Sequence, residues 1–600
     1  MRRTSEAPRG RCASPHAGLR GAIRGRWPGD WFALSILACL LAAMACAPTL
    51  APPPSASATP ARPTRTPPPP ATPIPTAAQQ ARYPGLPLPA EQADFFAGSG
   101  VCAVCHQSML DEAGQDVSID GAWRASMMAQ SARDPYWQAA VQAETLRHPE
   151  QAEAIQEACA RCHMPLAQFT LEEQGESTRV LGEQGLLDPD HPLHSLAMDG
   201  VSCTLCHQIQ EGALGFPESY NGGFEIDTET PAGERLIYGP YSVEPAQSDI
   251  MEITSGYLPT QGLHVIRSEL CATCHTLYVE SLDGSGVEFP EQVPYLEWYY
   301  SDFRSVRSCQ DCHMPEAQGG VRIAITSPFP RSPFAQHTFA GGNAYMLGML
   351  QAFAEELQVT ASGEHLQQAR QRTLDLLQEQ TASLTFGALQ LSGSRLTAEV
   401  RVENQAGHKL PTGFPARRAW LHFQVADASG AIVFESGAVD AQGRIAGNAS
   451  DQEPSQFEPH YLVIAQSDQV QIYEAVLRDS SGSVTTGLMQ ASGYLKDNRL
   501  LPSGLDPARA LESIRPVGQT SEDADFFGGE DSLQYAVDLG EAPRPLTVTV
   551  ELLFQSIGYR WAENLRELEG SQIEQFLRFY DALPNAPVVL AAVSEVVGGP

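Results

Sequence analysis

The sequence predicts an α+β protein of several domains: a mainly α-helical, loop-rich region with many cysteine pairs, a helical connector and an antiparallel β-sandwich. Three observations predict this fold class. Ten of the 13 cysteines form CxxCH motifs between residues 90 and 345. Apolar residues recur with a helical period across residues 346–383. From 384 to 557 they alternate instead, with the turn sequences DASG and DSSG between the runs.

Residues 1–45 are expected to be a signal peptide. The stretch Trp31–Cys46 follows seven arginines and is apolar over about 15 residues, which is short for a membrane span and typical of a secretory signal. The sequence AMAC at its end resembles a bacterial lipobox, so Cys46 is predicted to be a lipidated N-terminus. A plain signal peptide and a retained helix remain the alternatives. The expected location is exported, as a membrane-anchored lipoprotein in the periplasm or at the cell surface.

Residues 46–89 are predicted to be a tether. The segment "APPPSASATPARPTRTPPPPATPIPTAAQQ" consists mostly of proline, threonine and alanine. Such a composition cannot build a core and favours an extended chain of roughly 3 Å per residue. We therefore expect neither helix nor strand in this segment.

Residues 90–345 are defined by their cysteine pairs. In each pair two residues separate the cysteines and a histidine follows directly; we number these motifs box 1 to box 5 in chain order. The boxes are Cys102/Cys105/His106, Cys159/Cys162/His163, Cys203/Cys206/His207, Cys271/Cys274/His275 and Cys309/Cys312/His313. The other three cysteines lie in the first 46 residues, so the body has no cysteine outside a box.

The histidine after every pair decides between the possible meanings of CxxC. Structural zinc needs two pairs per ion or a pair with distant histidines, and a redox dithiol is expected once, near a βαβ pattern. Neither explains a histidine at the same offset five times. Covalent haem c does, because two thiols add to the porphyrin vinyl groups and the next residue supplies the proximal imidazole. The sequence therefore predicts five covalent haems c.

Several phrases resemble one known group of proteins. They are "GVSCTLCHQI", "CATCHTLY", "EQVPYLEWYYSDF" with "CQDCHMP", and "NQAGHKLPTGFPARRAW". They are similar to exported bacterial multihaem c-type cytochromes, within the superfamily that includes hydroxylamine oxidoreductase and its tetrahaem electron acceptor. The resemblance covers most of the chain after Phe95. Catalytic members carry more haems or a lysine as one proximal ligand, and this chain has neither, which weakens an interpretation based on nitrite or hydroxylamine.

A second axial ligand is expected on most haem irons, because carrier haems are usually six-coordinate. His194 and His264 lie just ahead of boxes 3 and 4, where similar positions in the family supply distal ligands. His337 also resembles a family ligand position. Met128 stands where related cytochromes have the histidine of W-x-x-S-x-H-A; it is predicted to bind iron through sulfur, or else to pack against a porphyrin. The weaker candidates are His148, His191 and His408.

The C-terminal part contains one further candidate site. The β-sandwich is expected over 384–557 and a helix with a tail over 558–600. The loop "SEDADFFGGED" carries Asp523, Asp525 and Asp531, which would suit a hard cation such as calcium. Solvated turn residues are the alternative, since the spacing is not that of an EF-hand loop.

The charge restricts the partners. Removal of residues 1–45 leaves 31 basic and 69 acidic residues, a net formal charge of −38. Such a surface repels nucleic acid and suits basic redox proteins, although solubility alone would also explain it. The leading hypothesis is an electron carrier without bond chemistry. The alternatives are a multihaem reductase or oxidase with one open haem acting on a small nitrogen or sulfur compound, and a haem wire with a β-sandwich docking module.

Overall fold

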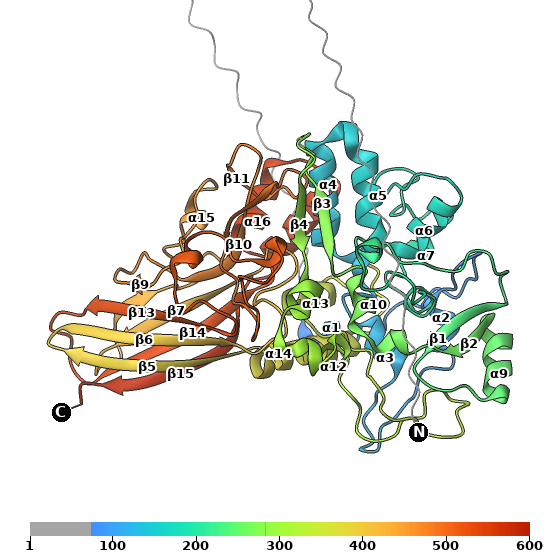
Figure 1. The fold of residues 1–600 in the computed structure, drawn as a ribbon, viewed down its shortest axis with the longest axis horizontal. Helices are drawn as coiled ribbons and strands as arrows, with labels where there is room; N and C mark the ends of the chain where they lie inside the picture. Colours follow the sequence, from blue (N-terminus) through green and yellow to red (C-terminus); the bar gives the residue numbers. More distant parts are fainter. Residues whose placement is uncertain (1–73, 283, 600) are drawn as a thin grey trace, which may run out of the picture. The chain divides into compact units, whose positions relative to one another are not determined.

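The computed structural model describes residues 74–282 and 284–599, which belong to one compact unit (Figure 1). The predicted signal peptide, Cys46 and the tether up to residue 73 lie outside the described residues. Within the described ranges, no helix is both long and apolar enough to cross a membrane.

The end of the predicted tether is folded, which differs from the expectation of neither helix nor strand. Thr76 caps helix α1 (Ala77–Ala81), because its hydroxyl accepts from the backbone N–H of Gln79 while the Gln79 side chain accepts from the backbone N–H of Thr76. The Tyr83 hydroxyl then donates to the Val359 carbonyl at 2.8 Å. The capping box stabilises α1, and the bond from Tyr83 to Val359 holds this segment against the rest of the folded protein.

Short helices joined by long loops build the region of the boxes (Figure 1). Helix α4 begins where the Asp134 carboxylate accepts from the backbone N–H groups of Tyr136 and Trp137, with Pro135 at its first position. The helices are α2 (Ser99–Ala103), α3 (Ile119–Arg124), α4 (Pro135–Arg147), α5 (Ala152–His163), α6 (Pro165–Glu173), α7 (His194–Ala197), α8 (Cys203–Cys206), α9 (Pro245–Ser255), α10 (Ser268–Ala272), α11 (Pro294–Tyr299) and α12 (Cys309–His313).

Two small sheets also lie in this region, and sequence reasoning missed both. Strands β1 (Arg235–Gly239) and β2 (Tyr257–Gln261) pair in parallel, with α9 as the connection. Strands β3 (Leu277–Glu280) and β4 (Glu288–Gln292) form an antiparallel hairpin. Each strand has only four or five residues, so none gives a clear alternating pattern.

The helical connector consists of α13 (Ala344–Ala352) and α14 (Gly363–Gln380). The Ser362 hydroxyl caps α14 by accepting from the backbone N–H of His365. Apolar side chains of both helices share a buried cluster with α17 (Ser571–Ala582), in which the rings of Phe353 and Phe579 stack at 4.0 Å. This cluster packs the helical connector against α17.

Two sheets form the C-terminal sandwich, which confirms the α+β fold class. One sheet has the order β11-β10-β7-β14-β15, with β12 beside β10 and β8 beside β7, and the other has the order β5-β6-β13-β9. Phe423 of β7 and Tyr535 of β13 stack between the sheets at 3.8 Å. The strands are β5 (Ala382–Ser392), β6 (Arg395–Asn404), β7 (Arg418–Ala426), β8 (Ile432–Ser436), β9 (Val463–Ile464), β10 (Ile472–Arg478), β11 (Val484–Thr485), β12 (Gly493–Asp497), β13 (Glu530–Asp538), β14 (Leu546–Gln555) and β15 (Val588–Val597).

The C-terminal segment contains the expected helix, but a strand forms where a tail was expected. After α16 (Tyr559–Glu563) and α17, the chain returns as β15 and pairs antiparallel along β14, from Leu546 opposite Val597 to Phe554 opposite Val588. Pairing with β15 gives the backbone groups along this edge of β14 their partners. The apolar run "VVLAAVSEVV" has no regular alternation, so its sequence does not reveal the strand.

Candidate cofactor-binding site

One cavity of about 1640 Å³ collects the residues of all five boxes. It exceeds the roughly 300–1,000 Å³ of sites for one small ligand. All five box histidines line it, as do His337, His408, Met127 and Met128. The lining cysteines are Cys102, Cys159, Cys162, Cys203, Cys206, Cys271, Cys274, Cys309 and Cys312. Thus nine of the ten box cysteines face one space, and Cys105 lies outside its lining.

A single helical turn orients each box. The backbone N–H of His106 donates to the carbonyl of Cys102 at 3.1 Å, and boxes 3 and 4 repeat this bond at 3.1 and 3.0 Å. Residues three and four positions apart lie on one face of such a turn, which brings the thiols and the imidazole of a box close together. None of the ten box cysteines, all of which lie in the described ranges, forms a disulfide bond. The geometry fits a planar group held by two thioethers over one imidazole.

Backbone carbonyls fix four of the box imidazoles through Nδ1. The Nδ1 atoms of His106, His207 and His313 lie 2.6 Å from the carbonyl oxygens of Ile323, Tyr238 and Ala340, and that of His163 lies 3.2 Å from the Ser131 carbonyl. Such a bond sets the tautomer in which Nδ1 carries the proton and Nε2 is free to bind a metal. These four box histidines are therefore oriented as metal ligands.

Two box imidazoles face a second imidazole. The rings of His207 and His337 have centroids 6.3 Å apart and planes 22° apart, and those of His313 and His408 have centroids 6.1 Å apart and planes 11° apart. Two metal–nitrogen bonds of about 2 Å, plus roughly 1 Å within each ring, give about 6 Å between centroids. Both pairs therefore have the spacing of two axial ligands on one ion.

The loop between β6 and β7 carries His408 to the cavity. The Asn404 side chain at the end of β6 donates to the His408 carbonyl at 2.8 Å. Glu297 of α11 accepts from the backbone N–H of Lys409 at 3.1 Å and from the Thr412 hydroxyl at 2.5 Å. The Nδ1 atom of His408 lies 2.9 Å from the Lys409 carbonyl, which leaves Nε2 toward His313. Sequence reasoning missed Glu297, whose role appears only when α11 packs on this loop.

The other predicted distal ligands occupy different surroundings. Met128 lines the cavity and packs against a buried apolar cluster. The Nδ1 atom of His194 lies 2.9 Å from the Leu186 carbonyl, which leaves its Nε2 free. His264 is buried, and its Nε2 lies 2.9 Å from the Ile209 carbonyl, which leaves Nδ1 as its available nitrogen. Neither His194 nor His264 lines the cavity, and the same holds for His148 and His191.

Thiol contacts between boxes show which boxes are neighbours. Each contact brings together cysteines of different boxes, and the neighbouring Cys203 thiol lowers the pKa of Cys102. The contacts are Cys102 with Cys203, Cys162 with Cys274, and Cys271 with Cys309. Box 1 therefore adjoins box 3, and boxes 2 and 5 both adjoin box 4. The neighbouring Cys162 thiol and burial raise the pKa of Cys274, and the nearby Cys206 contributes further. Box 3 therefore lies near box 4.

Burial dominates the electrostatics of the cavity. It lowers the pKa of His163 and His275 to about 4 and that of His337 to about 3. Each imidazole is therefore neutral near pH 7, the form that binds a metal. Burial, with the added charge of Glu144, raises the pKa of Glu291 to about 8. Glu291 lines the cavity and is a residue that the sequence did not single out.

The Trp137 ring of α4 stacks on the His163 imidazole, with centroids 4.5 Å apart and planes 5° apart. This stacking covers one face of the His163 ring, whose Nδ1 also lies beside the Ser131 carbonyl. Trp137 was not predicted either, because the sequence offers nothing that links it to box 2.

No family model and no curated protein matches this chain. Among solved structures, the chain is similar to a penta-heme cytochrome c552 from Thermochromatium tepidum. The TM-score is 0.46 and the sequence identity 17%, over 85% of this chain and 100% of that chain.

Proposed function

We propose that this chain is an exported pentahaem c-type cytochrome that transfers electrons between redox partners and is anchored to a membrane through Cys46. The observation that carries the proposal is the convergence of five CxxCH boxes, each with its imidazole, on one cavity. Haem bound there would supply one-electron redox chemistry. The ten box cysteines would hold it covalently, and the five box histidines would be its proximal ligands.

His337 and His408 are the best supported distal ligands, for boxes 3 and 5 respectively. Each faces the box imidazole at a spacing suited to two axial ligands, and in the His313–His408 pair both Nδ1 atoms lie beside backbone carbonyls. For the remaining boxes we propose Met128, His194 and His264, with His148 and His191 as weaker candidates. Coordination by His408 would make the β-sandwich part of the redox site in addition to any docking role.

The thiol contacts support one continuous electron path. They connect box 1 to box 3 and connect boxes 2 and 5 to box 4, with box 3 beside box 4. Box 1 lies at the outer end, since Cys105 is outside the cavity lining and its neighbours Val104 and Ile325 are 55% and 61% exposed. The backbone N–H of Ile325 donates to the Cys105 carbonyl, so these apolar side chains flank box 1. We propose box 1 as an entry or exit point for electrons.

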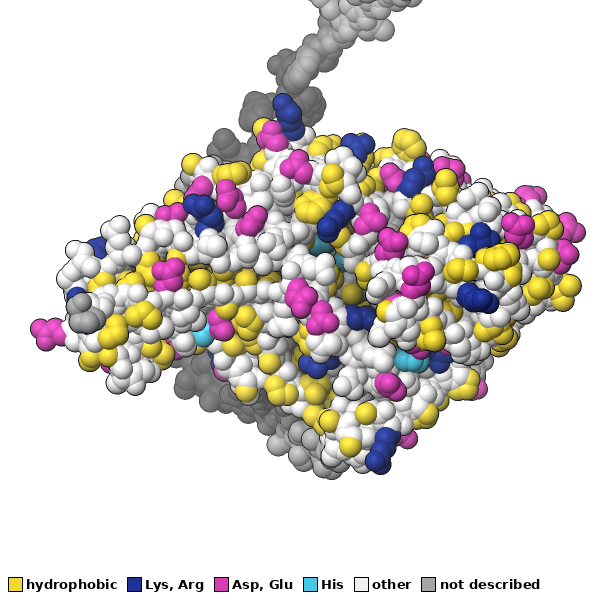
Figure 2. All heavy atoms as spheres, turned by 90° about the horizontal axis from the view of Figure 1, so that it is seen from below, with side chains coloured by type: hydrophobic (Ala, Val, Ile, Leu, Met, Phe, Trp, Pro, Cys, Tyr) yellow, Lys and Arg dark blue, Asp and Glu magenta, His cyan; other side chains and the backbone are white. Residues whose placement is uncertain are grey.

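Acidic residues around box 1 support partners with basic surfaces. Three segments that contact one another there, 104–116, 241–256 and 316–331, carry seven acidic and two basic residues. Exposed apolar side chains surrounded by acidic residues suit the binding of a small basic redox protein, because the charges of the two surfaces are complementary. On the face shown in Figure 2, acidic and basic side chains are interspersed with apolar ones.

A reductase or oxidase is the second candidate, and Glu291 is the observation that favours it. Its side chain is 7% exposed, faces the cavity and forms no hydrogen bond with any described residue. A buried carboxyl with a raised pKa is suited to donate protons at a redox centre. The substrate of such a centre would be a small nitrogen or sulfur compound bound at an open iron.

Mass and spectroscopic measurements test the proposal on protein matured by an exporting host. A mass corresponding to five covalent haems is expected, and four or fewer on fully matured protein would overturn the assignment. For a pure carrier, all irons are low-spin. A high-spin iron whose spectrum shifts on addition of nitrite, hydroxylamine or sulfite would instead support the reductase or oxidase.

A further inference from the structure

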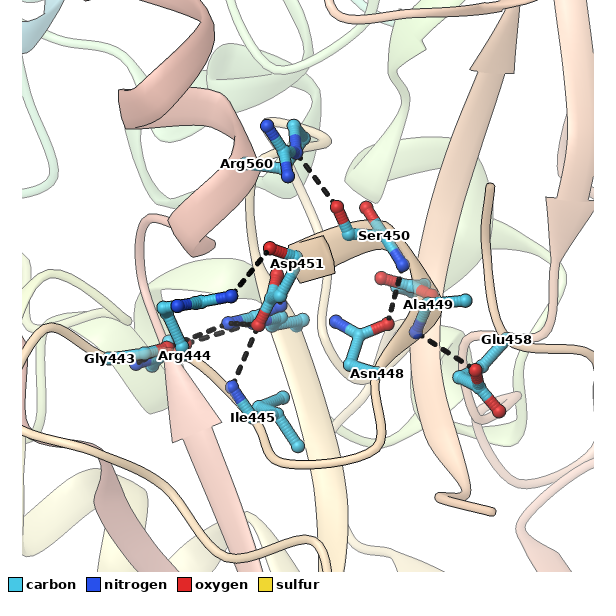
Figure 3. Close-up of polar contacts among 12 residues, drawn as sticks. Gly443, Arg444, Ile445, Asn448, Ala449, Ser450, Asp451, Glu458 and Arg560 are labelled. Atoms are coloured by element: carbon cyan, nitrogen blue, oxygen red, sulfur yellow. Dashed lines mark hydrogen bonds and ion pairs between the residues drawn. The ribbon is translucent and has the colours of Figure 1, made fainter. Parts of the chain in front are cut away.

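Several buried carboxylates of the β-sandwich are paired with a cationic side chain. Asp497 accepts from Lys409 and Arg499, and the Asp451 carboxylate accepts from Arg418 at 2.8 and 3.0 Å. Figure 3 shows the surroundings of Asp451, including its bond from the Ile445 backbone N–H. Such pairing offsets the large cost of removing a charge from water.

Three aspartates at another place in the sandwich have no such partner. Asp523 is 9% exposed and Asp531 1%, and Asp525 lies beside Asp523, whose Oδ1 accepts from the Asp525 backbone N–H at 3.1 Å. Within the described part of the chain, no lysine or arginine forms an ion pair with any of the three. Together the three side chains carry up to three negative charges. Carboxylates that face one another are stable only when they share a proton or bind a cation.

His460 completes the cluster as a hydrogen-bond donor. One ligand atom of His460, one of Asp523 and one of Asp531 lie within 4.8 Å of one another. The Nδ1 atom of His460 accepts from the side-chain amides of Gln471 at 2.9 Å and Asn498 at 3.1 Å. Both amide oxygens are already used by backbone N–H groups, which fixes the orientation of the amides. The proton is therefore on Nε2, 2.9 Å from Asp523, so the imidazole does not offer Nε2 to a metal.

Asp531 has one carboxylate oxygen that is left without a partner among the described residues. One oxygen of Asp531 accepts from the Tyr473 hydroxyl at 2.6 Å, whereas the other, Oδ1, is buried without a partner in the described structure. Native proteins rarely leave a buried carboxylate oxygen without a hydrogen bond or an ion. We propose that Asp523, Asp525 and Asp531 bind a hard divalent cation, Ca²⁺, with His460 donating to the Asp523 carboxylate.

Calcium fits this donor set better than a transition metal does. The available donors are carboxylate oxygens, which Ca²⁺ prefers, and its coordination geometry is flexible enough for donors from a loop and a strand. The cation would join the loop that follows residue 520 to strand β13.

Calcium titration of the full-length holoprotein after chelator treatment tests the proposal. We expect one Ca²⁺ per chain by calorimetry and a rise in Tm of about 5 °C at saturating Ca²⁺. Asp525→Asn and Asp531→Asn should abolish both effects. Asp479→Asn is the matched control, since Asp479 caps an exposed turn of the same sandwich and should leave both effects unchanged.

Two outcomes would overturn the site: no Ca²⁺ uptake by chelator-treated wild-type protein, or unaltered uptake by Asp525→Asn. Asp525 is partly exposed, so its variant decides the question if Asp531→Asn fails to fold. Far-UV circular dichroism and the haem absorption spectrum establish folding independently of calcium. Mg²⁺ alone should bind far more weakly, because it demands a stricter octahedral geometry.

Discussion

The imidazole rings of His313 and His408 lie nearly parallel, 11° apart, with their centroids separated by 6.1 Å. His313 belongs to box 5, whereas His408 belongs to the loop between two strands of the β-sandwich. Each ring has its Nδ1 beside a backbone carbonyl, so both Nε2 atoms are available to an ion between them. This relationship links the two halves of the chain through one proposed iron.

Replacement of His408 by alanine should leave one haem without its distal ligand. We expect about one fifth of the iron to become high-spin in the electron paramagnetic resonance spectrum, because only the box 5 iron loses an axial nitrogen. Added imidazole should restore the low-spin signal. His422→Ala is the control, as His422 lies on β7 and contacts Glu435 and Glu551 instead. A fully low-spin His408→Ala protein would show that His408 is not a ligand.

Lipidation at Cys46 is tested by Cys46→Ala. The wild-type protein should partition with membranes, because two or more acyl chains bind a bilayer far more firmly than one. The variant should be released in soluble form or retain an uncleaved leader. Fractionation and mass spectrometry of the N-terminus measure both. Unchanged processing and membrane attachment of the variant would place the anchor elsewhere.

Local patterns carried most of what the sequence could predict. The run "RLTAEVRVEN" alternates and forms β6 over its whole length, Arg395–Asn404. The boxes fix the thiols and imidazoles by spacing within one turn. His408 lies beside His313 because Glu297 binds the loop that carries His408, through Lys409 and Thr412. Glu297 is 112 positions from Lys409 and 115 from Thr412 in the sequence, so no local pattern reveals the contact. Strand β15 was missed for the same reason, since pairing with β14 decides its structure.

Asp451→Asn should strongly destabilise the sandwich. It would leave the Arg418 guanidinium, whose side chain is 4% exposed, without its ionic partner. Breaking a buried pair in this way costs about 3–5 kcal/mol of unfolding free energy. The midpoint of urea denaturation measures the loss, and Asp479→Asn, at an exposed turn, should change it by less than about 0.5 kcal/mol. If the midpoint hardly moves, the pair contributes little and water reaches Arg418.

Acid should remove the stabilisation provided by Asp497. Burial alone raises the pKa of this carboxyl, but the charges of Arg499 and Lys409 outweigh burial and hold the pKa well below its ordinary 3.8. Because the folded pKa is depressed, the stabilisation is complete above 3.8 and is lost as the pH falls through the folded value. The difference in urea midpoint between wild type and Asp497→Asn should therefore be constant from pH 7 to about 5 and shrink below about 4. A difference independent of pH would mean that Asp497 does not act through its charge.

Hydrogen bonds fix the backbone at Met128, whose side chain lines the cavity. The Trp123 indole N–H donates to the Val201 carbonyl at 3.0 Å, and the backbone N–H of Val201 donates to the Met128 carbonyl, also at 3.0 Å. These bonds fix the turn after α3, so that Met128 lines the cavity.

Sulfur ligation by Met128 should give the weak long-wavelength absorption band of ferric His/Met haem. Met128→Ala should abolish the band, whereas Met127→Ala, at a neighbour that also lines the cavity, should keep it. Met128→His should keep the iron low-spin and lower its reduction potential, because imidazole favours the ferric state relative to thioether. Redox titration followed by absorption separates this haem from the others. Survival of the band in Met128→Ala, or its absence in the wild type, would assign Met128 to packing against the porphyrin.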